Sequence, residues 1–231
     1  MPMSYPFRDS DGLTGGQAAQ RAISQIEKQI GGDSLAAIII EPIRGEGGFI
    51  VPSSGFLPPW PTLSAWARDN GVVFIADEVQ TGFARTGDWF ACNDEGVVPE
   101  IITMANGIAG GMPLAATDTM REFDLPARAR RFGETVTTRL RALAGEVGVI
   151  GDVRGRDGMI AVELVRPGTT EPDAEMAKEV TAQCLAEGVI ILTCGTYGNV
   201  IRLLPPLVID DDLLADGLDV LTAAIPAAAG H

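Results

Sequence analysis

A carboxylate ends one of the apolar runs of this chain. Asp77 closes the run VVFIAD at 72–77, and the polar, glycine-punctuated stretch EVQTGFARTG follows at 78–87. Open parallel sheets bind ligands at the carboxyl ends of their strands. A carboxylate there could therefore meet a protonated ring nitrogen, a sugar hydroxyl or a metal ion. An Asp that only caps the following turn fits the spacing equally well.

A second candidate is the glycine cluster RGEGGF, which contains Gly45, Gly47 and Gly48. Its backbone amides could cradle a phosphate. However, no GK[ST] follows, which excludes a Walker loop, and the strict dinucleotide fingerprint is missing. The spacing alone favours a turn that exposes Glu46.

Two lone polar residues accompany apolar runs. Asn106 follows the run at 101–105 and opens a loop that carries Gly107, Gly110 and Gly111. Arg202 lies within VIRLLPPL at 200–207. A buried Arg needs a partner, so Arg202 either pairs internally or awaits an anionic ligand. Without further context, internal pairing is favoured.

The elements that must position these residues follow from hydrophobic periodicity. Strand, helix and strand alternate in the first half, which predicts βαβ units and a parallel sheet. The apolar runs are continuous, which is typical of strands covered on both faces. A smaller α+β region is expected in the second half of the chain. The expected helices are 14–30, 62–71, 120–145, 172–188 and 210–225, and the expected strands are 35–41, 72–77, 99–105, two within 149–165, 189–194 and 200–207.

The composition excludes several classes of function. A net charge of -14 over 231 residues argues against nucleic acid or an anionic membrane as a partner. No apolar run has membrane-spanning length. The odd set Cys92, Cys184 and Cys194, without a secretory signal, favours a reducing, cytoplasmic compartment. The only histidine is His231, so histidine triads and histidine-ligated metals are excluded, and no metal site is expected.

Several stretches together resemble the class III aminotransferases that depend on pyridoxal phosphate, and among them the 4-aminobutyrate aminotransferases. The resemblance covers nearly the whole chain, in the family's order, and DEVQTGFARTG is its most specific part. It implies a fold-type I α/β architecture, with a partial cofactor-binding large domain at 1–116 and a C-terminal small domain at 117–231. The stretches are IIIEPIRGEGGFIVP, VVFIADEVQTGFARTGDWFAC, ITMANGIAGGMPLAA, VIGDVRGRDGMIAVELV and LTCGTYGNVIRLLPPLVI.

The resemblance also implies roles for individual residues. Asp77 would pair with the pyridine nitrogen of the cofactor and keep it protonated. Val79 would pack on the ring face, and Gln80 would bind near the ring oxygen. Arg202 would hold the carboxylate of an amino or oxo acid in a bidentate geometry, and Glu46 would neutralise an arginine when no acidic group is bound.

Residue 106 departs from the family pattern. The family places there the lysine that carries the cofactor as a Schiff base and moves the proton between substrate and cofactor. Asn106 is neither nucleophilic nor basic at neutral pH. The remaining lysines, Lys28 and Lys178, fall on predicted surface helices. Cofactor binding is therefore expected to be weak and non-covalent.

The resemblance predicts that the phosphate site is also missing. The chain begins where the family is already well into its large domain, past a phosphate-binding loop and an upstream arginine. GGMPLAA then runs directly into TDTMREFDLPARARR, where the family carries an intervening segment with a further phosphate contact across the dimer interface. GTYGNV at 195–200 looks similar to that segment but belongs to the C-terminal region, so the role is not transferred to Thr196.

Two functions are carried forward. The family activity is transfer of an amino group from a remote-amine amino acid to 2-oxoglutarate by a homodimer, and this chain is expected to perform it poorly or not at all. The alternative is a non-catalytic fragment, or an interaction module that pairs with an intact paralogue.

Overall fold

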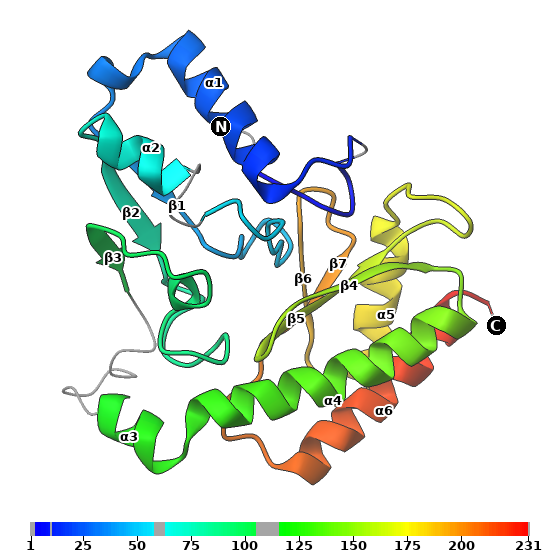
Figure 1. The fold of residues 1–231 in the computed structure, drawn as a ribbon. Coiled ribbons are helices and arrows are strands. Elements are labelled where there is room, and N and C mark those ends of the chain that lie inside the picture. The colour runs from blue at the N-terminus through cyan, green and yellow to red at the C-terminus, as the bar shows by residue number, and fades with distance from the viewer. Residues whose placement is uncertain (1–2, 10, 58–62, 105–115, 231) are drawn as a thin grey trace. The chain divides into compact units, whose positions relative to one another are not determined.

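The computed structural model describes residues 3–9, 11–57, 63–104 and 116–230, which form two compact units (Figure 1). Unit 1 extends to Arg44 and resumes from Ile50 to Glu122. Unit 2 runs from Phe123 to the C-terminus and also includes residues 45–49. A five-residue piece of the first half of the sequence thus belongs to the unit built by the second half.

Unit 1 is built on a parallel three-stranded sheet in the order β1-β2-β3. Its strands are β1 (Ala37–Ile40), β2 (Val73–Asp77) and β3 (Ile101–Thr103), and Asp77 lies beside Thr103 in the register. Helix α2 (Leu63–Asp69) connects β1 and β2, which confirms the predicted βαβ arrangement. The described part of this unit also contains two short 3₁₀ turns, η1 (Gly32–Ser34) and η2 (Ala91–Asn93).

Helix α1 (Gly15–Gln29) begins as its sequence predicts. The Thr14 side chain accepts a hydrogen bond from the Gln17 amide, and the Gln17 side chain accepts one from the Thr14 amide. This reciprocal pair satisfies two amides that the helix itself leaves without partners. The apolar face of α1 then packs with α2 and the sheet in one core, to which Ile23, Ile26 and Phe74 belong.

Only one face of this sheet is covered within the described residues. Ile38 and Ile40 of β1 are buried in the core with α1 and α2. Ile39 and Ile101, which point to the opposite face, are 58% and 48% exposed. The expectation that continuous apolar strands are covered on both faces is therefore wrong for the described part of the chain. An apolar run indicates that both faces of a strand can be buried. Whether they are buried depends on which other elements pack against the sheet.

The predicted helix over 120–145 is two helices, α3 (Ala116–Glu122) and α4 (Leu125–Glu146). Asp124 between them has a φ of 44°, in the left-handed region. Pro126 falls in the first turn of α4, where its missing N–H costs no helical hydrogen bond. In the interior of one long helix the same proline would remove a bond and clash with the preceding turn, which explains the break.

Unit 2 is an antiparallel four-stranded sheet with helices on one face. The strands are β4 (Ile150–Arg156), β5 (Met159–Leu164), β6 (Leu192–Cys194) and β7 (Val200–Leu203), in the order β4-β5-β7-β6. Helices α4, α5 (Ala174–Ala186) and α6 (Asp211–Ala228) share a core with Ile160, Val162 and Ile201. The alternate residues of these strands, among them Arg154, Glu163 and Arg202, point to the other face.

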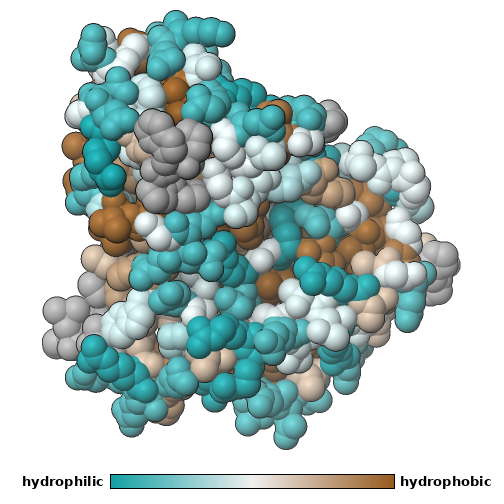
Figure 2. All heavy atoms as spheres, viewed as in Figure 1, coloured by the Kyte–Doolittle hydropathy of each residue, from teal (hydrophilic) through white to brown (hydrophobic). Residues whose placement is uncertain are grey.

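The surface in view is largely hydrophilic, with separate apolar patches (Figure 2). In the part of the chain that the structure describes, every helix is too short or too polar to cross a membrane.

Candidate cofactor and carboxylate sites

Asp77 stands at the carboxyl end of β2 with its side chain half-buried. Its Oδ1 accepts hydrogen bonds from the Thr103 hydroxyl, at 3.0 Å, and from the Val79 amide, at 3.2 Å. The strand end and two donors therefore fix the direction of the carboxylate. This geometry suits a carboxylate that must face one cationic group of a ligand.

The loop after Asp77 is held by the neighbouring carboxylate, Glu78, which is fully buried. Glu78 accepts hydrogen bonds from the Thr81 hydroxyl and from the amides of Ala91 and Cys92, the latter two at 3.0 and 2.8 Å. These bonds tie the start of the loop to η2. Val79 is left 36% exposed beside Asp77.

Burial shifts the titration of two groups around this loop. Burial, together with the hydrogen bond and charge of Glu78, raises the pKa of the Cys92 thiol to about 12. Burial also lowers the pKa of the Arg85 guanidinium to about 10, which leaves it cationic at neutral pH. Cys92 is thus a neutral part of the core rather than a nucleophile.

The second cluster belongs to unit 2 and brings Glu46 to Arg202. Residues 45–49, hereafter the 45–49 loop, form a turn in which the Gly48 amide donates to the Gly45 carbonyl at 2.9 Å. Arg202 Nη1 donates to Glu46 Oε1. The Arg202 side chain is 18% exposed and the Glu46 side chain is 67% exposed. A mostly buried guanidinium is therefore neutralised by a carboxylate that solvent reaches.

The polar face of the unit 2 sheet supports this loop. Arg154 on β4 donates from Nε to the Gly48 carbonyl at 2.8 Å, and the Gly195 amide donates to the Glu46 carbonyl at 3.0 Å. Arg154 Nη1 also contacts Glu163 at 2.6 Å. The same face therefore carries both the loop and its ion pair.

The sequence model of the family described as aminotransferase class-III matches residues 1–125 and 114–225. The chain belongs to the class III aminotransferase family. The 4-aminobutyrate aminotransferase of Mycobacterium leprae (strain TN) is 50% identical over 259 aligned positions, which cover 96% of this chain and 57% of that protein. The 5-aminovalerate aminotransferase of Pseudomonas putida is 36% identical, over 89% of this chain and 56% of that protein.

Solved structures agree with this membership. An (S)-enantioselective omega-transaminase from Thermomicrobium roseum superimposes with a TM-score of 0.79 at 29% identity, covering 97% of this chain and 58% of that one. The predicted fold-type I architecture of a partial α/β domain with an α+β domain is confirmed. The chain spans a little over half the length of the relatives that it matches.

The alignment with the Mycobacterium leprae relative contains more positions than this chain has residues. That relative therefore carries residues, within the aligned region, that this chain lacks. The family model likewise matches in two stretches, which overlap at residues 114–125, rather than in one continuous match. Both findings support the expectation that a family segment is absent from the interior of this chain.

Class III aminotransferases depend on pyridoxal phosphate. Asp77 and Val79 fit the pyridine ring of that cofactor. A directed carboxylate can face a ring nitrogen, and an exposed apolar side chain beside it can face the ring. Gln80 follows them on the same loop and is half-buried.

Asn106, which is expected at the position of the covalent linkage, lies outside the described residues. Lys28 on α1 and Lys178 on α5 are exposed, and Lys178 pairs with Glu175 at 2.6 Å. Both lysines of the chain thus lie on helix surfaces, as predicted. Over the described ranges, His, Cys, Asp and Glu form no cluster of three that could hold a metal ion.

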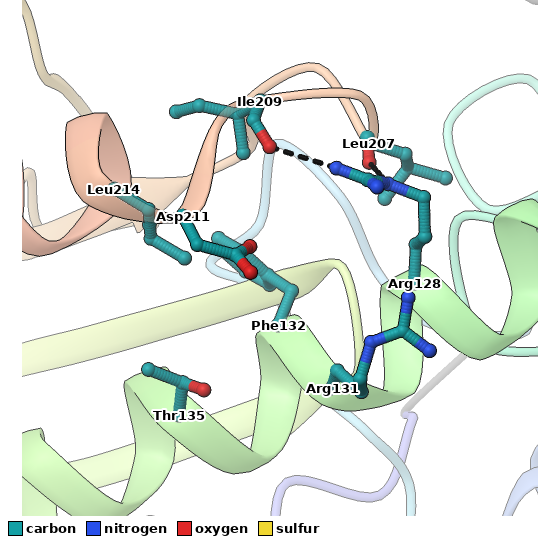
Figure 3. Close-up of a pocket in the computed structure, with 8 residues that line it drawn as sticks. All are labelled: Arg128, Arg131, Phe132, Thr135, Leu207, Ile209, Asp211 and Leu214. Carbon is teal, nitrogen blue, oxygen red and sulfur yellow. Dashed lines mark hydrogen bonds between the residues drawn. The ribbon is translucent and has the colours of Figure 1, made fainter.

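A separate pocket of 210 Å³ lies in unit 2 between the first turns of α4 and the segment before α6 (Figure 3). Arg128 lines it, but its guanidinium donates to the carbonyls of Leu207, at 2.8 Å, and Ile209, at 2.9 Å. These bonds tie the β7–α6 connection to α4. We interpret Arg128 as structural, and none of the residues expected to bind cofactor or substrate lines this pocket.

Sequence reasoning missed Thr103, Glu78 and Arg154. Thr103 and Glu78 act through hydrogen bonds to neighbouring segments, which no spacing pattern announces. Arg154 and Glu163 did carry a signal, because each is a charged residue in a strand of the small domain. The argument that a buried Arg202 needs a partner applies to them equally.

Proposed function

We propose that this chain binds the carboxylate of an amino or oxo acid at Arg202 and the ring of pyridoxal phosphate at Asp77. The reaction is that of a 4-aminobutyrate:2-oxoglutarate aminotransferase, and the chain's own turnover is severely impaired because Asn106 replaces the cofactor-linking lysine. In this proposal residues 1–116 are a partial cofactor-binding domain and residues 117–231 the small domain. The pairing of Arg202 with Glu46 is the observation that carries the proposal.

The pair suits a site that must accept two kinds of ligand. With an acidic ligand, a carboxylate takes the place of Glu46 at the guanidinium in a bidentate geometry that lysine does not reproduce. With a ligand that lacks a second acid, such as 4-aminobutyrate during amino-group donation, Glu46 keeps Arg202 neutralised. Glu46 is exposed enough to move aside, and Arg202 is held on a strand.

At the proposed cofactor site, the residues of this chain would hold and orient the pyridoxal phosphate ring. When bound, the cofactor supplies a protonated ring that accepts electrons from the substrate carbon. Asp77, fixed by Thr103 and the Val79 amide, would keep the ring nitrogen protonated, and Val79 and Gln80 would contact the ring. Without the lysine the cofactor is held non-covalently, and the general-base step, typically worth about 10²–10⁴-fold in rate, is lost as well.

The experiment combines turnover, mass and binding. Purified protein with pyridoxal phosphate, 4-aminobutyrate and 2-oxoglutarate should yield no glutamate above background, and borohydride reduction should leave its mass unchanged. Glutarate should bind in calorimetry, and Arg202→Lys should weaken it about tenfold or more by losing the bidentate contact. Clear turnover or a covalent adduct would refute the impaired site. Glutarate binding that Arg202→Lys leaves unchanged would refute the carboxylate site.

The Asn106→Lys variant separates two causes of inactivity. If the lysine alone is missing, the variant should form an adduct with pyridoxal phosphate that borohydride fixes. If the phosphate-binding groups are also lacking, as the resemblance implies, the adduct should form only at high cofactor concentration. An adduct as tight as in an intact aminotransferase would contradict the second cause.

A second candidate function is an interaction module that pairs with an intact aminotransferase chain. The exposed row of Ile39 and Ile101 on the unit 1 sheet favours it, because exposed apolar side chains on a sheet face are common at protein interfaces. Co-purification with a full-length class III aminotransferase would support pairing, and a monomer in the presence of that enzyme would count against it. The cytoplasm is part of either proposal, since all three cysteines are free thiols.

A further inference from the structure

The 45–49 loop is attached to the polar face of the unit 2 sheet by its backbone. The Gly48 carbonyl accepts from Arg154 Nε at 2.8 Å, and the Glu46 carbonyl accepts from the Gly195 amide at 3.0 Å. The loop backbone is therefore fixed at Glu46 itself and again at Gly48, two residues further on. The Glu46 side chain remains largely exposed and reaches Arg202. The backbone of Glu46 is thus bound to the sheet, whereas its side chain, which pairs with Arg202, is largely exposed to solvent.

Arg154 is itself held in one orientation. Its side chain is 9% exposed, and Nη1 contacts the carboxylates of Glu163, at 2.6 Å, and Asp152, at 3.0 Å. Glu163 is fully buried and also accepts a hydrogen bond from Asn199, at 3.3 Å. A guanidinium fixed by two acids presents its Nε in a defined direction, and the Gly48 carbonyl lies there.

The loop approaches Arg154 closely, and glycine makes this possible. Gly48 has a φ of 117°, and a Cβ built on it would lie 3.0 Å from Arg154 Nη2. A side chain at this position would be strained in its backbone and would press on the guanidinium. The contact therefore depends on both partners, a glycine at position 48 of the loop and an arginine at position 154 of β4.

The register of the sheet relates Arg154 to Arg202. Ala161 on β5 is paired with Arg154 on one side and with Arg202 on the other. The two arginines are thus in one row across the sheet, separated by the smallest of side chains after glycine. One arginine holds the loop backbone, and the other meets the carboxylate that the loop carries.

We propose that Arg154 is a positioning residue that holds Glu46 opposite Arg202 and thereby sets how strongly Glu46 competes with a ligand carboxylate. The inference rests on the proposed binding of carboxylates at Arg202. Anchoring the loop raises the effective concentration of Glu46 at the guanidinium. The apparent affinity for a ligand carboxylate is proportional to the fraction of molecules in which Glu46 does not occupy Arg202. Loosening the loop should therefore tighten ligand binding, which a loss of general structure would not do.

The test is a double-mutant cycle with glutarate as the probe. Arg154→Lys keeps the positive charge but cannot span Gly48, Glu163 and Asp152 in the same geometry. Calorimetry should show glutarate binding about threefold to fivefold tighter in Arg154→Lys and in Glu46→Gln than in the parent chain. The double variant should bind no tighter than Glu46→Gln, because Arg154 acts through Glu46. Arg166→Lys, at a surface arginine of the same unit, is the matched control and should leave the affinity unchanged.

Hydrogen exchange of the full chain supplies a readout that needs no ligand. Amides of the 45–49 loop should exchange about tenfold faster in Arg154→Lys, and those of the α4 interior should not change. Unchanged loop exchange would overturn the inference, as would an effect of Arg154→Lys on glutarate that persists in the Glu46→Gln background. Absence of glutarate binding in every variant would instead refute the proposed carboxylate site. In that case the hydrogen-exchange result alone would decide whether Arg154 anchors the 45–49 loop.

Discussion

Thr103 on β3 donates a hydrogen bond from its hydroxyl to Asp77 Oδ1 on β2, at 3.0 Å, across directly paired positions of adjacent strands. The bond occupies one oxygen of the carboxylate and sets the plane in which the other can meet a ligand. Thr103 stands three residues before Asn106 in the sequence. The strand that leads to Asn106, the position proposed for the family's lysine, thus also orients the carboxylate proposed to bind the cofactor ring.

Removing this donor should weaken the binding of pyridoxal phosphate. Thr103→Val keeps the shape of the side chain and removes a bond that orients the Asp77 carboxylate before the ligand binds. Ordering a side chain on binding costs about 0.5–1.5 kcal/mol, so the dissociation constant should rise by about twofold to tenfold. Fluorescence titration with the cofactor measures it. Thr103→Ser retains the hydroxyl and should bind nearly as the parent does. Equal affinities for the Val and Ser variants would show that Thr103 has no part in orienting Asp77.

The buried carboxylate of Glu78 should contribute mainly to stability. Glu78→Ala removes the carboxylate that accepts from the buried amides of Ala91 and Cys92, at a cost of about 1–3 kcal/mol for each bond. The free energy of unfolding in urea should therefore fall by about 2–5 kcal/mol. The same change at the exposed Glu122 is the comparison, with an expected effect within about 0.5 kcal/mol. A loss as small for Glu78 would mean that water satisfies those amides.

Local patterns accounted for much of the fold. The helix expected over 14–30 agrees with α1, whose start is fixed locally by a capping box between Thr14 and Gln17, residues only three apart. The runs before Glu41 and Asp77 predicted parallel strands, because two strands separated by a helix cannot form a hairpin. At Pro126 the prediction was wrong, because the periodicity on both sides favoured one continuous helix, whereas α4 begins only at Leu125.

Contacts between distant residues could not be predicted in the same way. Glu46 and Arg202 are 156 residues apart, and Gly48 and Arg154 are 106 apart. The sequence indicates that a lone charge in a strand needs a partner, because leaving it unpaired is costly, but not which residue supplies it. Likewise, the apolar run at β1 does not tell whether anything covers Ile39. Those answers depend on the topology of the whole unit.

The two faces of β1 provide a matched pair of substitutions. Ile38 is 6% exposed and belongs to the core, whereas Ile39 is 58% exposed. Ile38→Ala should destabilise the chain by about 2–5 kcal/mol through lost burial and the cavity left behind, and Ile39→Ala by less than about 1 kcal/mol. Urea unfolding of both variants measures the difference. Comparable losses would indicate that the Ile39 face is covered in solution, for example by a second copy of the chain.

Alkaline pH should destabilise the chain through its buried thiols. Burial raises the pKa of Cys92 to about 12 and that of Cys194 to about 11, from an ordinary value of 9.0. Below pH 9 both thiols are protonated in the folded and unfolded states, so their stabilising effect is fully present. Between pH 9 and these raised values the unfolded chain loses protons that the folded chain keeps, and stability falls by at most about 1.4 kcal/mol per pH unit for each thiol.

Urea unfolding at pH 8 and at pH 10 measures this loss. Cys92→Ala should reduce the loss between the two pH values, because alanine removes one titrating group. A variant that loses as much stability as the parent would show that Cys92 ionises alike in both states.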